Sequence, residues 1–159
     1  MSKAIIAFIT VSFLFIGCKD HPKEGKSVKK NDTEHMKQPA QSNTDGNSWV
    51  QGIKTNDGAK WIANPETNEG VVRMQSVITT SKPKDLNDYF SIADALNKEK
   101  NYVIKECTMK GPSHDNLHLW LLPLIKKIDA LKEAESLAEA QHIYKSIEQN
   151  VNAYDNFFE

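Results

Sequence analysis

The stretch HDNLHLWLLPLIKKIDALK, residues 114–132, decides the fold class. Its large apolar residues recur every three or four positions, which is the period of one face of an α-helix. They are Leu117, Leu121, Leu124, Ile125, Ile128 and Leu131. Gly111 and Pro112 stand just before it, and Ser113 can cap a helix that starts there. The stretch therefore predicts a long amphipathic helix with one side buried.

Three further segments show the same helical period. One begins at Asn64, which can cap a helix, and ends before Pro83. Another begins at Asp85, and its apolar stripe runs as far as Cys107. The last begins at Ser136, where Ser-Leu-Ala-Glu forms a capping box. Four amphipathic helices with short connections pack most simply as an antiparallel up-and-down bundle.

We therefore expect an all-α fold with four parts along the chain. Residues 64–159 form the four-helix bundle. Residues 49–63 carry short apolar runs around an Asn-Asp-Gly turn, which predicts a β-hairpin or an extended arm. Residues 18–48 are nearly all polar and predict a disordered tether. Residues 1–17 have the plan of an export signal, with Lys3 before an apolar run.

The end of the leader carries a resemblance to a known class. At Phe15-Ile16-Gly17-Cys18 it resembles the signal of bacterial lipoproteins. The resemblance implies that Cys18 becomes the first mature residue, carries lipid such as palmitate, and anchors the protein to a membrane. Lys19 stands where an aspartate often marks retention in the inner membrane, so the resemblance implies the outer membrane of the cell envelope. An ordinary secretory signal and an uncleaved anchor are the alternatives.

Charge limits the classes of partner. The formal net charge of the 159 residues is −1, and the lysines of the tether are offset by acidic residues in the same segment. A nucleic-acid backbone has little to attract it here, so we expect no nucleic-acid partner. The membrane, through lipid on Cys18, and an unidentified envelope protein remain as expected partners.

Four side chains with metal-donor atoms lie close together in the sequence, around the break between the second and third helices. They are Cys107, Met109, His114 and His118, with Met74 of the first helix as a further candidate. The two histidines are four residues apart, which places both imidazoles on one face of a helix. Sulfur with imidazole favours copper first, and zinc or haem iron less. The cluster predicts a transition-metal site for metal binding, buffering or electron transfer.

The bundle is also similar to the soluble periplasmic b-type cytochromes, which are four-helix haem proteins. The likeness lies in Ile128-Asp129-Ala130-Leu131, Glu139-Ala140 and Asn152-Ala153-Tyr154-Asp155. It implies a four-helix fold with haem b and Met74 as an axial ligand. Asp155 stands where that family has its axial histidine, and carboxylates seldom bind haem iron. A haem b reading would therefore need Met74 with His114 or His118.

The sequence also bears on two other function classes, an enzyme and an interaction module. The chain shows no Ser-His-Asp spacing, no glycine-rich phosphate loop and no paired carboxylates, so we do not expect an enzyme. A metal-free interaction module is the main alternative to the metal site. In that reading Trp49, Trp61 and the helix surfaces dock a partner, and the Cys-Met-His cluster serves packing and turn formation.

Overall fold

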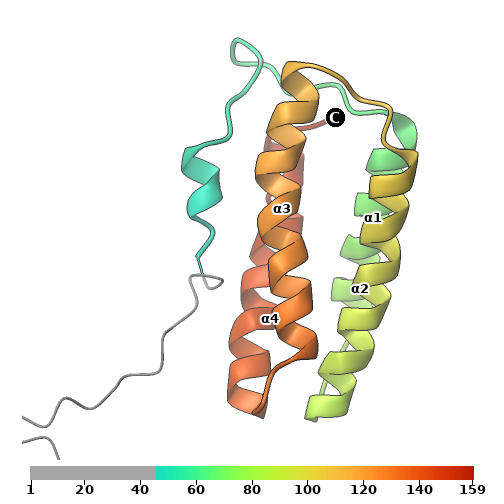
Figure 1. The fold of residues 1–159 in the computed structure, drawn as a ribbon, viewed down its shortest axis with the longest axis vertical. Coiled ribbons are helices and arrows are strands. Elements are labelled where there is room, and N and C mark those ends of the chain that lie inside the picture. The colour runs from blue at the N-terminus through green and yellow to red at the C-terminus, as the bar shows by residue number, and fades with distance from the viewer. Residues whose placement is uncertain (1–45) are drawn as a thin grey trace, which may run out of the picture. The chain divides into compact units, whose positions relative to one another are not determined.

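The computed structural model describes residues 46–159, which contain four α-helices and two short 3-10 helices. The α-helices are α1 (Pro65–Thr80), α2 (Leu86–Glu106), α3 (Pro112–Lys132) and α4 (Leu137–Asn152). The 3-10 helices are η1 (Ser48–Gln51) and η2 (Tyr154–Asn156). Consecutive α-helices run in opposite directions and are joined by short loops (Figure 1). The predicted all-α four-helix fold is confirmed.

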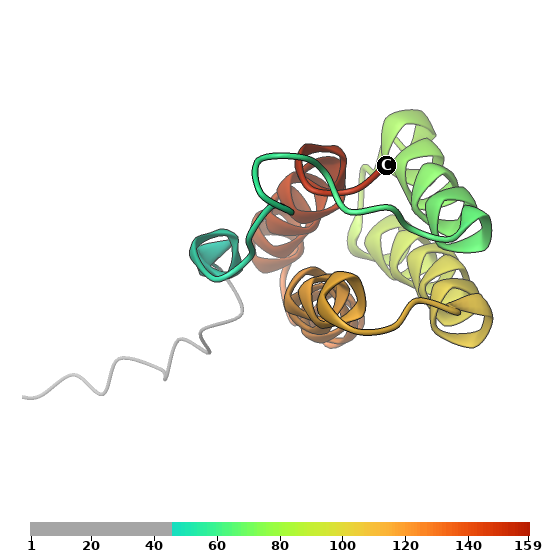
Figure 2. The ribbon, with the colours of Figure 1, turned by 90° about the horizontal axis from the view of Figure 1, so that it is seen from above.

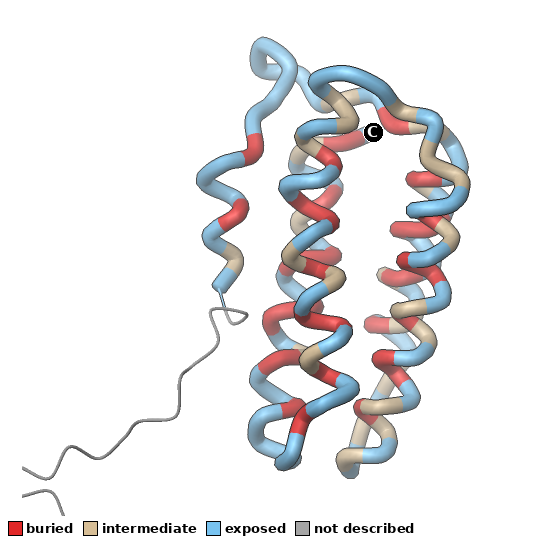
Figure 3. The backbone as a smooth tube through the Cα atoms, viewed as in Figure 1, coloured by how far each residue is buried: buried red, intermediate tan, exposed pale blue. Residues whose placement is uncertain are grey.

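Each helix packs on the next one along the chain, α1 and α4 also meet, and seen from above the four helices surround one core (Figure 2). Buried positions follow the inward sides of all four helices (Figure 3). The fully buried apolar side chains include Met74, Leu96, Val103, Trp120, Leu124, Ile128, Leu131 and Ile147. Within the described residues, no helix is long and apolar enough to cross a membrane.

Local signals explain where the helices begin. The Asp85 carboxylate accepts a hydrogen bond from the Asp88 backbone N–H, and the Asp88 carboxylate accepts one from the Asp85 N–H, which completes a capping box. Ser136 Oγ accepts from the Glu139 N–H at 3.2 Å. The Glu139 carboxylate reaches back to the N–H of Glu135 instead of Ser136, so this second box is shifted by one residue. These bonds satisfy N–H groups that have no partner inside a helix.

The segment before the bundle forms an arm that contains η1 and one tight turn, and the predicted β-hairpin is not confirmed, because the described residues of the arm contain only isolated bridges. The Asn-Asp-Gly turn forms, with positive φ at Asp57 (52°) and Gly58 (94°), and it closes with two backbone hydrogen bonds between Asn56 and Ala59. No ladder continues from it. The N-terminal side enters η1, where Trp49 is buried, and the other side pairs elsewhere.

That other side pairs with the C-terminal residues of the chain. Trp61 N–H donates to the Phe157 carbonyl at 2.7 Å, and Glu159 N–H donates to the Trp61 carbonyl at 3.0 Å. Ala63 N–H donates to the carbonyl of Glu159 at 2.9 Å, which gives a short parallel pairing around Trp61 and Phe158. This long-range partner takes the backbone groups that a hairpin would have used.

The leader, Cys18 and nearly all of the tether lie outside the described residues. The predictions of a signal peptide, a lipidated cysteine and a disordered segment therefore remain predictions.

Candidate functional site

The turn between α2 and α3 carries the predicted donor side chains, and its shape follows from the sequence. Helix α2 ends at Glu106, and Cys107 takes an extended conformation (φ −66°, ψ 119°) while its N–H still bonds to the Val103 carbonyl at 3.0 Å. Gly111 has a φ of 63°, in the region that favours glycine, and Pro112 occupies the first turn of α3. The chain reverses here and places the start of α3 beside the end of α2.

His114 and His118 are the two candidates that the structure brings together. They lie on consecutive turns of α3, and their ring centroids are 4.2 Å apart with an interplanar angle of 54°. His114 is half-buried and His118 is exposed. Within the described part of the chain, the structure shows no hydrogen bond or ion pair to either ring. The ring nitrogens are therefore not engaged by protein groups.

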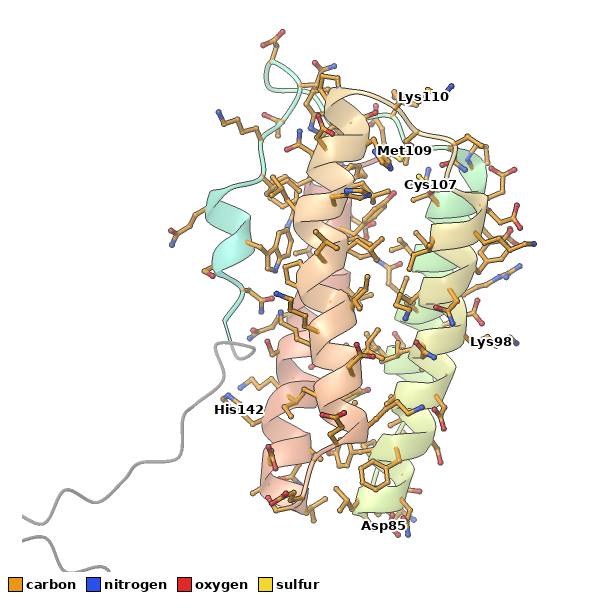
Figure 4. All side chains as sticks on the ribbon, viewed as in Figure 1. Asp85, Lys98, Cys107, Met109, Lys110 and His142 are labelled. Carbon is orange, nitrogen blue, oxygen red and sulfur yellow. The ribbon has the colours of Figure 1, made fainter. Side chains whose placement is uncertain are left out.

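Cys107 and Met109 are both half-buried and pack against the hydrophobic core (Figure 4). Burial is the main cause that raises the pKa of Tyr154. Tyr154 itself is 2% exposed and donates its hydroxyl to Asn68 Oδ1 at 2.7 Å. Cys107 packs against the core, as its place on the apolar stripe of α2 predicted.

The five predicted donors do not form one assembled site. Among residues 46–159, no three His, Cys, Asp or Glu side chains are grouped closely enough to hold a metal ion. Met74 is fully buried in the core. What the structure brings together ahead of any ligand is the histidine pair, with the sulfur atoms of Cys107 and Met109 on the adjoining loop.

Comparisons with protein-family models, curated proteins and solved structures found no match to this chain. The structure also places Asp155, which stands where the resemblance to b-type cytochromes implies an axial histidine. Asp155 is exposed and its carboxylate accepts a hydrogen bond from the Gln75 side chain at 3.0 Å, so it acts as a surface link between η2 and α1.

The electrostatic setting of the histidine pair is nearly balanced. The N-terminal end of α3 carries a partial positive charge that disfavours a bound cation. Asp115 lies in the first turn of the same helix, and the C-terminal end of α2, with its partial negative charge, meets α3 at this turn. In the last turn of α2, Lys105 and Glu106 form an ion pair at 2.6 Å, so their charges offset each other.

A second polar cluster lies on another side of α3, and sequence reasoning did not find it. Lys127 is 1% exposed, and its Nζ donates to Asn47 Oδ1 at 2.5 Å and to Asn150 Oδ1 at 2.9 Å. Asn150 is fully buried, donates to the Trp120 carbonyl at 3.2 Å and, through its own carbonyl, accepts from Trp120 Nε1 at 2.8 Å. Trp49 Nε1 adds a bond to Asn47 Oδ1 at 2.9 Å.

This cluster fastens the arm to α3 and α4. Its signal was present in the sequence, because Trp120, Leu124, Lys127 and Leu131 share one helical stripe, so the lysine stands at a core position. A charged side chain at such a position is tolerated only when polar partners surround it. No buried side-chain nitrogen or oxygen in the described residues lacks a hydrogen bond.

A third polar cluster joins α1 to α2 at the surface. Arg73 bonds to Glu69 at 2.6 Å and stacks its guanidinium on the Tyr102 ring, 4.5 Å from the centroid. Tyr102 donates its hydroxyl to Glu69 at 2.8 Å. The hydrogen bond from Tyr102, followed by that from Arg73, lowers the pKa of Glu69. The two helices approach closely here: a Cβ atom on Gly70 would lie 2.4 Å from Val103 Cγ2, so only glycine fits at this position.

Both tryptophans of the arm are engaged inside the domain. Trp49 is 8% exposed and meets the ring of Phe157 edge-on, with centroids 6.0 Å apart. Trp61 is half-buried and donates Nε1 to the Lys54 carbonyl at 2.6 Å. In the alternative reading as an interaction module, these tryptophans dock a partner. Docking through their rings would therefore require them to give up these contacts.

Proposed function

We propose that this chain is a lipid-anchored protein of the bacterial cell envelope whose helical domain binds a transition metal, copper first, at the α2–α3 turn. Its role would be to bind, buffer or pass on the metal, or to carry an electron. The observation that carries the proposal is the close approach of the imidazoles of His114 and His118, which have no hydrogen bond or ion pair within the described residues. Anchoring would come from lipid on Cys18, at the outer membrane.

The spacing of the rings suits two ligands of one ion. A metal–nitrogen bond is near 2 Å and the ring centroid lies roughly 1 Å beyond the nitrogen. Two imidazoles bound to one ion at right angles would then have centroids about 4.2 Å apart. The observed separation is 4.2 Å. Imidazole suits copper, zinc, iron and nickel alike, so the preference for copper comes from the sulfur atoms on the adjoining loop.

The sulfur atoms extend the proposal to reduced copper. Cys107 and Met109 lie on the loop that leads into α3, and thiolate and thioether ligands select copper(I). A ligand set that combines them with the histidines would require the loop residues 107–111 to move, because no three-residue group of His, Cys, Asp or Glu stands assembled among the described residues. The histidine pair would be the first point of attachment.

The test is a copper(II) titration of the full chain, followed by electron paramagnetic resonance to count nitrogen ligands. We expect one equivalent with splitting from two imidazole nitrogens. His118→Ala should weaken binding at least about tenfold, which is about 1.4 kcal/mol. His142→Ala is the matched control, since His142 is an exposed histidine on α4. Equal affinity in the wild type and His118→Ala, or the same loss in His142→Ala, would contradict the site.

Anchoring is tested separately. Mass spectrometry of the chain recovered from bacterial membranes should show acyl chains on Cys18 and no residues 1–17. Cys18→Ser should remove the lipid and release the protein from the outer-membrane fraction. A chain that keeps its leader, or that stays in the membrane without the cysteine, would overturn the anchor and leave the metal proposal standing.

A further inference from the structure

One side of α3 is turned away from every other helix and carries an unusual set of exposed residues. Leu119 is 42% exposed and Leu122 is 53% exposed, so neither leucine is covered by the rest of the domain. Asp115 and Lys126, also exposed, stand one turn before and one turn after them. The spacing i, i+4, i+7, i+11 places all four on a single stripe. We call these four residues the α3 stripe.

Neither charged member of the α3 stripe is used inside the domain. Within the described residues, no ion pair or side-chain hydrogen bond joins Asp115 or Lys126 to another group. Lys132, further along the same helix, does form an ion pair, with Asp94 of α2. The two ends of the α3 stripe therefore carry opposite charges that no intramolecular partner neutralises.

The α3 stripe is complementary to itself when one copy is turned end over end. In an antiparallel pairing of two α3 helices about a two-fold axis between Leu119 and Leu122, each Leu119 meets the partner's Leu122. The same axis brings each Asp115 opposite the partner's Lys126, because both pairs of positions are centred on the same point of the helix. An isologous interface requires this kind of self-complementarity.

We propose that the α3 stripe is a homodimer interface in which two copies of this chain pack their α3 helices antiparallel. Four leucines form the apolar centre and two Asp115–Lys126 ion pairs flank it. A single pair of helices buries a small area, so the dimer is weak and reversible. The ion pairs fix register and orientation more than affinity.

The first experiment is sedimentation equilibrium of the full chain in density-matched detergent. We expect a monomer–dimer equilibrium at concentrations of about 100 μM that weakens as salt is raised. Leu122→Ser should lower the association constant at least about tenfold. Val72→Ser is the matched control, since Val72 is a 60% exposed apolar residue on α1. A wild type that stays monomeric, or equal effects of the two serine variants, would overturn the proposal.

The second experiment exchanges the charges. Lys126→Asp alone should place four acidic side chains in two facing pairs and abolish the dimer, and Asp115→Lys alone should place four lysines there. The double variant Asp115→Lys/Lys126→Asp restores opposite charges and should restore dimerisation. Circular dichroism checks folding, because Asp115 also stabilises the first turn of α3. A double variant that is folded but monomeric, while the wild type dimerises, would place the interface elsewhere.

A cross-link fixes the register. In a Cys107→Ser background, Asp115→Cys with Lys126→Cys should give a covalent dimer on mild oxidation, whereas Val72→Cys should not. An equal yield from both would show non-specific contact and contradict the antiparallel arrangement.

Discussion

Lys127 and His118 lie on the same helix but in opposite surroundings. The lysine is 1% exposed, and its Nζ is bonded to side chains from the arm and from α4. The imidazole of His118 is exposed, lies against the ring of His114, and has no hydrogen bond or ion pair within the described residues. Buried polar groups hold a fold together when every partner is present, and exposed ones without partners cost nothing to keep and are free to bind. The comparison distinguishes polar residues that stabilise the fold, such as Lys127, from polar residues that are available to a ligand, such as His118.

The largest expected effect comes from breaking the buried cluster. Asn150→Ala removes one of the acceptors of the buried Lys127 ammonium and the side-chain donor to the Trp120 carbonyl, and it leaves a cavity in the core. We expect a loss of about 2–3 kcal/mol in the free energy of unfolding, measured by urea denaturation. Asn152→Ala, at the exposed end of α4, should change it by less than about 0.5 kcal/mol. The affinity for copper should stay the same. A fall in copper affinity would show that the buried cluster also supports the histidine pair, and the two sites would then not be independent.

A smaller effect is expected at the surface cluster of α1 and α2, which is exposed yet partnered. The pKa of Glu69 is lowered, first by Tyr102, so its contribution to stability is present above the ordinary glutamate pKa of 4.5. It is lost as the pH falls through the lowered value. The unfolding free energy of Glu69→Gln should therefore lie below that of the wild type at pH 7 and converge on it at low pH. Glu148→Gln on α4 is the control, and a gap that persists in acid would contradict this account.

The smallest effect is expected from removing both imidazoles. His114→Ala/His118→Ala deletes side chains that are not hydrogen-bonded and adds two good helix formers, so the unfolding free energy should change by less than about 0.5 kcal/mol. The difference should appear only with metal. Copper should raise the melting temperature of the wild type through preferential binding to the folded state and leave the double variant unchanged. A large loss of stability without metal would make the pair structural.

The helices were predictable because local rules and burial agree there. The helical period of residues 114–132 and the caps at Asp85 and Ser136 each specify an element without help from distant residues. The predicted hairpin is not confirmed at Trp61, because a partner at the far end of the chain, Phe157, takes its N–H. No local pattern reveals such a pairing.

The candidate site was predictable only in part, for a similar reason. Spacing on one helix is local, so the approach of His114 to His118 followed from the sequence. Convergence of Cys107 with them depends on how the loop is laid against the core, which spacing does not determine. Lys127 was overlooked because a lysine is read as solvated, although its place on the apolar stripe of α3 marked it as buried.

The pairing of Trp61 with Phe157 and Glu159 also determines when, during synthesis, the arm can pack against the domain. Its hydrogen bonds reach Phe157 and Glu159, and Phe158 beside them is 2% exposed. A chain emerging from the ribosome or a translocation pore therefore leaves the arm unfastened, and part of the core open to proteases and chaperones, until residue 159 has cleared the exit. Loss of Phe157, Phe158 and Glu159 would remove the backbone hydrogen bonds that hold the arm and would expose the part of the core that Phe158 covers.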